Sequence, residues 1–123
     1  MTEIKLQGEF DELEFLEAFW VEPTQRKPEE GYWCYEITDE LGIALKFGID
    51  IIQASVQIEL KLAENSIGIF SFENVESINI LDYQVGRISF ESFPNNSKMA
   101  IHVQVELRSR IKIKCSTLSL AAA

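Results

Sequence analysis

The side chains that could carry catalysis are few in this chain of 123 residues. It has one histidine, His102, and two cysteines, Cys34 and Cys115, which lie far apart in the sequence. A catalytic histidine needs a nucleophile or an orienting acid beside it, and zinc usually takes three or four protein ligands. The sequence has no glycine-rich phosphate loop and no G-x-S-x-G motif. We therefore predict that the protein is not an enzyme and has no catalytic residue, metal site or cofactor.

Four cations near the C-terminus form the clearest charged pattern. Arg108, Arg110, Lys112 and Lys114 alternate with other residues, so a continuous strand would project them from one face over about 20 Å. Such a row could bind anions. The alternative is a solvated outer face, or a row paired with acidic residues such as Glu59 or those of the N-terminal third.

Acidic residues dominate the first third of the chain. The formal net charge is −9, from 20 acidic and 11 basic residues. Residues 1–40 contain twelve acidic and three basic residues, whereas residues 41–123 contain eight of each. This balance argues against nucleic-acid binding through bulk positive charge, and it suits a basic protein partner.

Aromatic residues accompany these acids around the loop predicted at residues 21–31. Tyrosine and tryptophan are favoured at binding surfaces because one end of the ring is apolar and the other can form a hydrogen bond. The predicted partner-binding residues are Glu22, Glu29, Glu30, Tyr32, Trp33, Asp39 and Glu40. The alternative is that the rings close the core where a helix meets a sheet.

The expected cellular location is the cytoplasm. The first residues lack a basic stretch followed by an apolar run of roughly 7–15 residues, as in a signal peptide. No segment approaches the roughly 18 uninterrupted apolar residues of a membrane span, so we expect no membrane binding. In the cytoplasm both cysteines stay reduced, and their strand-like surroundings predict buried thiols.

One helix is predicted near the N-terminus, over residues 9–20. An apolar stripe at spacings of three and four predicts its buried face, which consists of Phe10, Leu13, Leu16, Phe19 and Trp20. Phe15 lies off this stripe. The helix should lay the stripe against a sheet or plug one end of a barrel.

After the helix the apolar residues alternate, which is typical of β-strands. Residues 32–37 and 43–49 form a predicted hairpin around the turn at 39–42, and four further strands follow up to residue 90. The alternation then continues unbroken from residue 101 to 113, which favours one long strand over a hairpin. We predict a mainly β (α+β) domain, an antiparallel sandwich or open barrel of seven to eight strands with one N-terminal amphipathic helix. A single domain covers residues 1–120, and residues 121–123 are interpreted as a cloning scar.

The second half of the chain resembles a known class of protein. Phe72, Val75, Ile78 and Ile80 have the spacing F-x-x-V-x-x-I-x-I, and a further strand and the phrase Ile113-Lys114-Cys115 follow. This rhythm, over residues 67–118, is similar to that of small β-rich bacterial immunity proteins of polymorphic or contact-dependent toxin systems. The resemblance implies a stoichiometric toxin inhibitor without catalysis, and it carries no residue-specific role.

The leading hypothesis is therefore a non-enzymatic protein-interaction domain that binds a basic protein, in its sharpest form a toxin-neutralising immunity protein. One alternative is a small-ligand-binding β domain with an apolar cavity. Another is an enzyme with an unrecognised carboxylate pair, which a raised carboxyl pKa in a cleft would reveal. The oligomeric state is not predicted.

Overall fold

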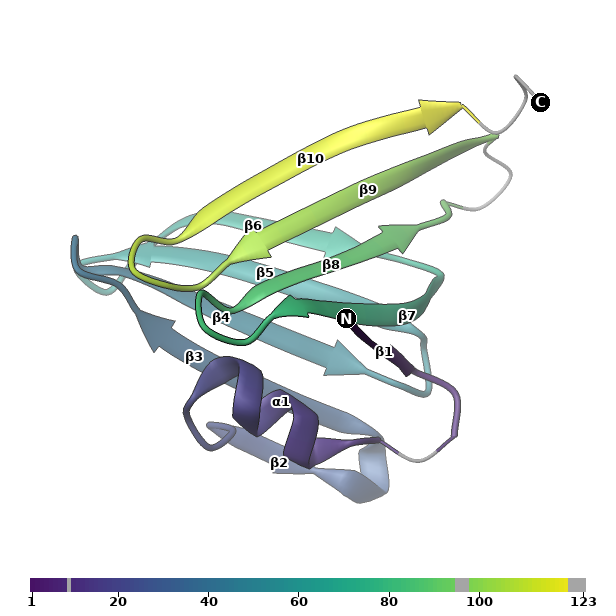
Figure 1. Cartoon of the computed structure of the whole chain (residues 1–123), viewed down its shortest axis with the longest axis horizontal. Helices are drawn as coiled ribbons and strands as arrows, with labels where there is room; N and C mark the ends of the chain where they lie inside the picture. The colour runs from purple at the N-terminus through teal and green to yellow at the C-terminus, as the bar shows by residue number, and fades with distance from the viewer. Residues whose placement is uncertain (9, 95–97, 120–123) are drawn as a thin grey trace.

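Two antiparallel five-stranded sheets face one another in the computed structural model, which describes residues 1–8, 10–94 and 98–119 (Figure 1). The first sheet has the order β1 (Thr2–Lys5), β7 (Val75–Asp82), β8 (Arg87–Ser92), β9 (Met99–Glu106) and β10 (Lys112–Ser119). The second has the order β2 (Gln25–Lys27), β3 (Tyr32–Thr38), β4 (Ile43–Asp50), β5 (Ser55–Leu62) and β6 (Asn65–Phe72). The predicted antiparallel sandwich is thus confirmed, and the open barrel is not what forms. Residues 121–123 lie outside the described residues.

The core lies between the sheets, where alternate residues of each strand point inward. Leu45, Phe47 and Ile49 of β4 are fully buried, as are Ile78 and Ile80 of β7. Aromatic rings join the two layers, because the Phe90 ring of β8 lies 6.2 Å from Phe47 and 5.3 Å from Phe72. The strict alternation in the sequence follows directly from this burial of one face.

The described residues contain ten strands where seven to eight were predicted. Strand β2 occupies part of the segment predicted as a loop, and it pairs with the start of β3. The predicted long strand at 101–113 is wrong, since β9 and β10 form a hairpin in which Val105 pairs with Ile113. Residues paired in this hairpin both have even numbers or both have odd numbers. The apolar alternation therefore continues across the turn, and it cannot distinguish a hairpin from one strand.

Helix α1 (Glu12–Phe19) is shorter than predicted, and it lies alongside β2 and β3 (Figure 1). Asp11 caps its first turn, accepting a hydrogen bond from the backbone N–H of Glu14 at 3.3 Å. Trp20 ends it in the left-handed conformation, with φ 63°, and its N–H donates to the Leu16 carbonyl. Acidic residues in the first turn suit the positive end of the helix dipole.

The buried face of α1 differs from the predicted stripe. Phe15 and Ala18 are fully buried together with Phe19, whereas Leu13 is 62% exposed and Trp20 is 58% exposed. Phe15 and Phe19 stack against Tyr35 of β3, with ring centroids 6.0 and 4.7 Å away. Residues 15, 18 and 19 also have helical spacing, and these aromatic contacts decide between the two stripes.

Candidate partner-binding surface

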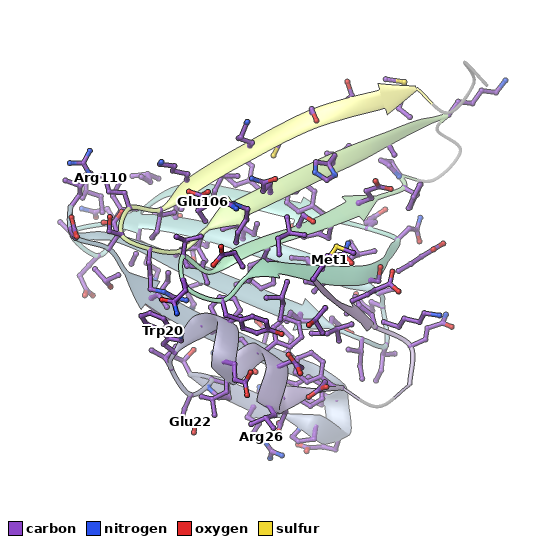
Figure 2. The ribbon with its side chains drawn as sticks, viewed as in Figure 1. Met1, Trp20, Glu22, Arg26, Glu106 and Arg110 are labelled. Carbon is purple, nitrogen blue, oxygen red and sulfur yellow. The ribbon has the colours of Figure 1, made fainter. Side chains whose placement is uncertain are left out.

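The predicted partner-binding residues do not form one cluster. Glu29 and Glu30 lie in a short 3-10 segment, η1 (Pro28–Glu30), which precedes β3, whereas Asp39 and Glu40 lie in the turn after β3. The seven residues of β3 separate these two pairs of acids by about 20 Å, because an extended strand rises by roughly 3.3 Å per residue. Glu22 lies in the loop between α1 and β2, on the same side of the helix as Arg26 (Figure 2).

Trp33 belongs to the core where the helix meets the sheet. It is 5% exposed, and its ring stacks on Phe10 with centroids 4.1 Å apart. Its indole N–H donates a hydrogen bond to the carboxylate of Glu12. The alternative interpretation of the aromatic residues, as rings that close the core, therefore describes Trp33 and its neighbour Tyr35.

Tyr32 lies on the opposite face of the sheet, because adjacent strand residues alternate. Its hydroxyl lies over Gly48, where an added Cβ would be only 2.8 Å away, so a side chain at that position would displace the ring. Burial, together with the neighbouring Cys34, raises the pKa of Tyr32 to about 12. Tyr32 lines a polar hollow of about 470 Å³ that Asp50 and Glu73 share.

Asp39 shapes a turn. Its carboxylate accepts hydrogen bonds from the backbone N–H groups of Leu41 and Ile43, at 2.9 and 3.0 Å, and from that of Ile111, at 2.9 Å. Burial raises the pKa of Asp39, but these donors and the charge of Arg110 outweigh it, so the pKa is lowered. Asp39 therefore ties the β3–β4 turn to the loop between β9 and β10.

Arg108 is held inside a network of backbone carbonyls. Its guanidinium group donates to the carbonyls of Ala18 at 2.9 Å, Tyr83 at 2.5 Å and Gln84 at 3.0 Å. The same group lies 3.4 Å from the centroid of the Trp20 ring. Burial lowers the pKa of Arg108, and the charge of Asp82 opposes that change. One cation of the predicted strip thus joins the β9–β10 loop to the end of α1.

The other three cations of the predicted strip are more exposed, and they do not lie along one strand. Arg110 lies in the β9–β10 loop (Figure 2), whereas Lys112 and Lys114 lie on β10. The Lys112 ammonium lies 3.8 Å from Glu106, a carboxylate that also pairs with Arg87 at 2.7 Å. The charge pattern is therefore partly internal, and anion binding by this strip stays a prediction.

A pocket that the sequence did not indicate lies between α1 and β2, and we call it the α1–β2 pocket. It measures about 240 Å³. Its apolar walls are Leu13, Leu16 and Pro23. Its other lining side chains are Glu12, Glu22, Arg26 and Tyr35.

The polar groups of this pocket differ in how well they are satisfied. Glu12 pairs with Arg26 through two hydrogen bonds, of 2.5 and 3.2 Å, and also accepts the Trp33 N–H. The bond from Arg26 is the main cause that lowers the pKa of Glu12. The Tyr35 hydroxyl is buried and has no hydrogen-bond partner among the described residues. A lowered carboxyl pKa is the opposite of what a general acid requires.

The opposite side of the sandwich presents the open edge, which we define as strands β6 and β10. Strand β6 carries no charged residue, and Ile67, Ile69 and Phe70 are 57%, 60% and 45% exposed. A groove of about 260 Å³ opens there, lined by Ile58, Leu60, Phe70, Phe72, Ile113 and Cys115. The prediction of two buried thiols holds for Cys34 but is wrong for Cys115, which is exposed because β10 is an edge strand.

Within residues 1–8, 10–94 and 98–119, no group of three His, Cys, Asp or Glu side chains is placed to hold a metal ion. His102 lies 3.9 Å from Glu91 on the neighbouring strand β8. No helix in this part of the chain is long and apolar enough to cross a membrane.

Comparisons with known proteins identify a shared fold. No protein-family model matches the chain, and no curated protein sequence matches it significantly. Among solved structures, a chain of a contact-dependent growth inhibition toxin–immunity protein complex from Klebsiella pneumoniae 342 superposes with a TM-score of 0.80. The match covers 94% of this chain and 100% of that chain, at 23% sequence identity. At the level of the fold, it confirms the resemblance that the strand rhythm indicated.

Proposed function

We propose that this chain is the immunity partner of a toxin–immunity pair and that it neutralises a basic toxin by binding alone, without catalysis. The observation that carries the proposal is the fold shared, over nearly the whole chain, with a chain of a contact-dependent growth inhibition toxin–immunity protein complex. An inhibitor of this kind needs a complementary surface and no reacting group.

The charge of the chain supports the immunity role over the toxin role. With a net charge of −9, it would attract a basic partner at long range, and such steering raises association rates at low salt. Several acids of the N-terminal third form internal contacts, among them Glu12 and Asp39. Glu17 of α1 and Glu22 of the loop that follows it remain exposed and form no ion pair with a described residue.

The proposed contact surface is the helix side, which we define as α1, the loop of residues 20–24, β2 and β3. It combines those two acids with the exposed apolar side chains of Leu13 and Trp20. Interfaces typically join an apolar or aromatic centre to a polar rim, and the helix side offers both. Glu29 and Glu30 adjoin it at the start of β3.

Growth rescue tests the immunity role. The protein encoded beside this chain in its genome is expressed from an inducible promoter, with and without this chain. We expect that the neighbour alone stops growth, that coexpression restores it, and that the two purified proteins form a one-to-one complex. Failure of coexpression to restore growth would show that the chain is not the immunity protein for that neighbour.

Association kinetics test the surface and the steering. Glu17→Gln with Glu22→Gln should lower the association rate constant several-fold at low salt and flatten its salt dependence. The matched control, Glu64→Gln with Glu73→Gln, makes the same change in net charge at exposed acids elsewhere, and it should have a smaller effect. Equal effects of the two pairs would argue against the helix side, and a salt-independent rate would argue against steering.

A second candidate function, binding of a small apolar ligand, is favoured by the groove at the open edge. Its lining is apolar apart from the Cys115 thiol. An apolar fluorescent probe such as anilinonaphthalene sulfonate should then bind the native protein, and Phe70→Ser should abolish the signal. If the native protein did not increase the fluorescence of the probe, this second function would be contradicted.

A further inference from the structure

The Tyr35 hydroxyl is the least expected group in the α1–β2 pocket. Tyr35 has no exposed surface, and its ring is fixed by stacking against Phe19. Buried hydroxyl groups are nearly always hydrogen-bonded, yet this one has no partner among the described residues. A buried hydroxyl of this kind is a site where a bound group can supply the missing hydrogen bond.

The charges around this hydroxyl define what can bind there. Burial raises the pKa of Tyr35, and the carboxylates of Glu12 and Glu22 raise it further, while Arg26 opposes them. The phenol therefore stays neutral, and its oxygen can accept a hydrogen bond. Two carboxylates and one guanidinium group line the pocket, so its net formal charge is negative and favours a cation over an anion.

The two carboxylates are not equally available. Glu12 is already occupied by Arg26 and Trp33. Glu22 forms no hydrogen bond or ion pair with any described residue, and it lines the same pocket. The pocket thus contains one carboxylate and one phenol that have no partner among the described residues, together with an apolar wall.

We propose that the α1–β2 pocket receives an arginine or lysine side chain of the bound protein, an inference that rests on the function proposed above. The aliphatic part of that side chain lies against Leu13, Leu16 and Pro23, and its cationic end binds between Glu22 and the Tyr35 hydroxyl. Long basic side chains combine an apolar stem with a charged head in this way. The pocket would therefore act as a specific anchor within a surface that otherwise attracts by charge.

The test uses small probes and needs no identified partner. N-acetyl-arginine methylamide and N-acetyl-lysine methylamide are titrated into the labelled protein and followed by amide chemical shifts. We expect saturable shifts at Leu13 and Leu16, with dissociation constants in the millimolar range for such small ligands. The norleucine derivative, which has a similar length and no charge, should bind at least several-fold more weakly.

Two variants identify the groups responsible. Tyr35→Phe keeps the ring and should weaken the arginine probe about tenfold, which is the value of one hydrogen bond to a charged group. Glu22→Gln should weaken it similarly, and Glu64→Gln, an exposed acid outside the pocket, should leave it unchanged. Equal binding of the norleucine probe, or full affinity in Tyr35→Phe, would overturn the proposal.

These outcomes are separable from those of the proposed function. If growth rescue succeeds and the pocket binds no cation, only the anchor is wrong. If the pocket binds the arginine probe and no rescue occurs, the cation site stands and the immunity role is wrong.

Discussion

The helix side and the open edge lie on opposite sides of the sandwich, and they differ in the side chains that they present. At the helix side, α1 covers β3, and polar contacts such as Glu12 to Arg26 and Tyr83 to Glu14 tie the elements together. At the open edge, β6 presents exposed isoleucines and no charge. Polar groups with defined geometry can select a charged partner, whereas an uncharged apolar strand such as β6 attracts without selecting. This difference supports the proposal that the helix side is the surface of specific recognition.

Removing the guanidinium of Arg108 should have the largest effect on stability. Arg108→Ala deletes three hydrogen bonds to backbone carbonyls and the contact with Trp20, which should lower the free energy of unfolding by about 3 kcal/mol. Urea unfolding measures this loss. Arg110→Ala is the matched control, because its side chain is exposed, and it should change stability by less than about 0.5 kcal/mol. Equal losses would mean that the carbonyl network does not hold the helix side together.

Two tyrosines that contact α1 should change stability with opposite signs when their hydroxyl groups are removed. Tyr35→Phe removes a buried hydroxyl that has no partner among the described residues, so the free energy of unfolding of the free protein should rise by about 1 kcal/mol. Tyr83→Phe removes a hydroxyl that forms hydrogen bonds with Glu14 and Thr2, so the free energy of unfolding of this variant should fall by about 1 kcal/mol. Thermal or urea unfolding compares the two. A loss in both variants would show that the Tyr35 hydroxyl is already satisfied, which would also remove the basis of the proposed anchor.

Alkaline pH should destabilise the protein through its tyrosines. The pKa of Tyr32 is raised to about 12, chiefly by burial, while an unfolded tyrosine titrates near pH 10. Above about pH 10 the unfolded chain therefore releases its proton first, and stability should fall until the folded pKa is passed. Urea midpoints measured across this range should fall less steeply in Tyr32→Phe. Identical slopes in the two proteins would contradict the raised pKa.

The sequence predicted the sandwich well because burial of one face imposes alternation on each strand. It failed at the β9–β10 turn, where the paired residues Glu106 and Lys112 have the same parity and a hairpin copies the pattern of one strand. Proline, glycine or asparagine would have marked that turn, but residues 107–111 contain none of them. The bends there are set instead by tertiary bonds from Asp39 and Arg108.

The candidate site was predicted less completely, because it depends on how the helix rotates. Residues 13, 16 and 20 and residues 15, 18 and 19 both have helical spacing, and only the stacking on Tyr35 chooses the second set. With that choice Leu13 and Leu16 become walls of a pocket. Glu22 was predicted as a partner-binding residue, and it lines this pocket. Nothing local in the sequence marks Tyr35 as a buried residue whose hydroxyl has no partner among the described residues. The burial of Tyr35 results from the packing of α1 against β3, which the sequence does not show.

The smallest expected change in stability comes from two exposed apolar residues, one on each side of the comparison. Ile69 of β6 and Leu13 of α1 are similarly exposed, at 60% and 62%. Replacing either by lysine should change the free energy of unfolding by less than about 0.5 kcal/mol.

An uncharged apolar edge strand is a template for pairing between copies, and a lysine on it prevents such pairing. Ile69→Lys, which places a cation opposite Glu59, should therefore reduce self-association at high concentration, as measured by sedimentation or light scattering. Leu13→Lys should leave self-association unchanged, since the backbone groups of a helix are already paired within it. If Leu13→Lys reduced self-association more than Ile69→Lys, the helix side would be the surface through which copies associate. The division between a selective helix side and an unselective β6 edge would then be wrong.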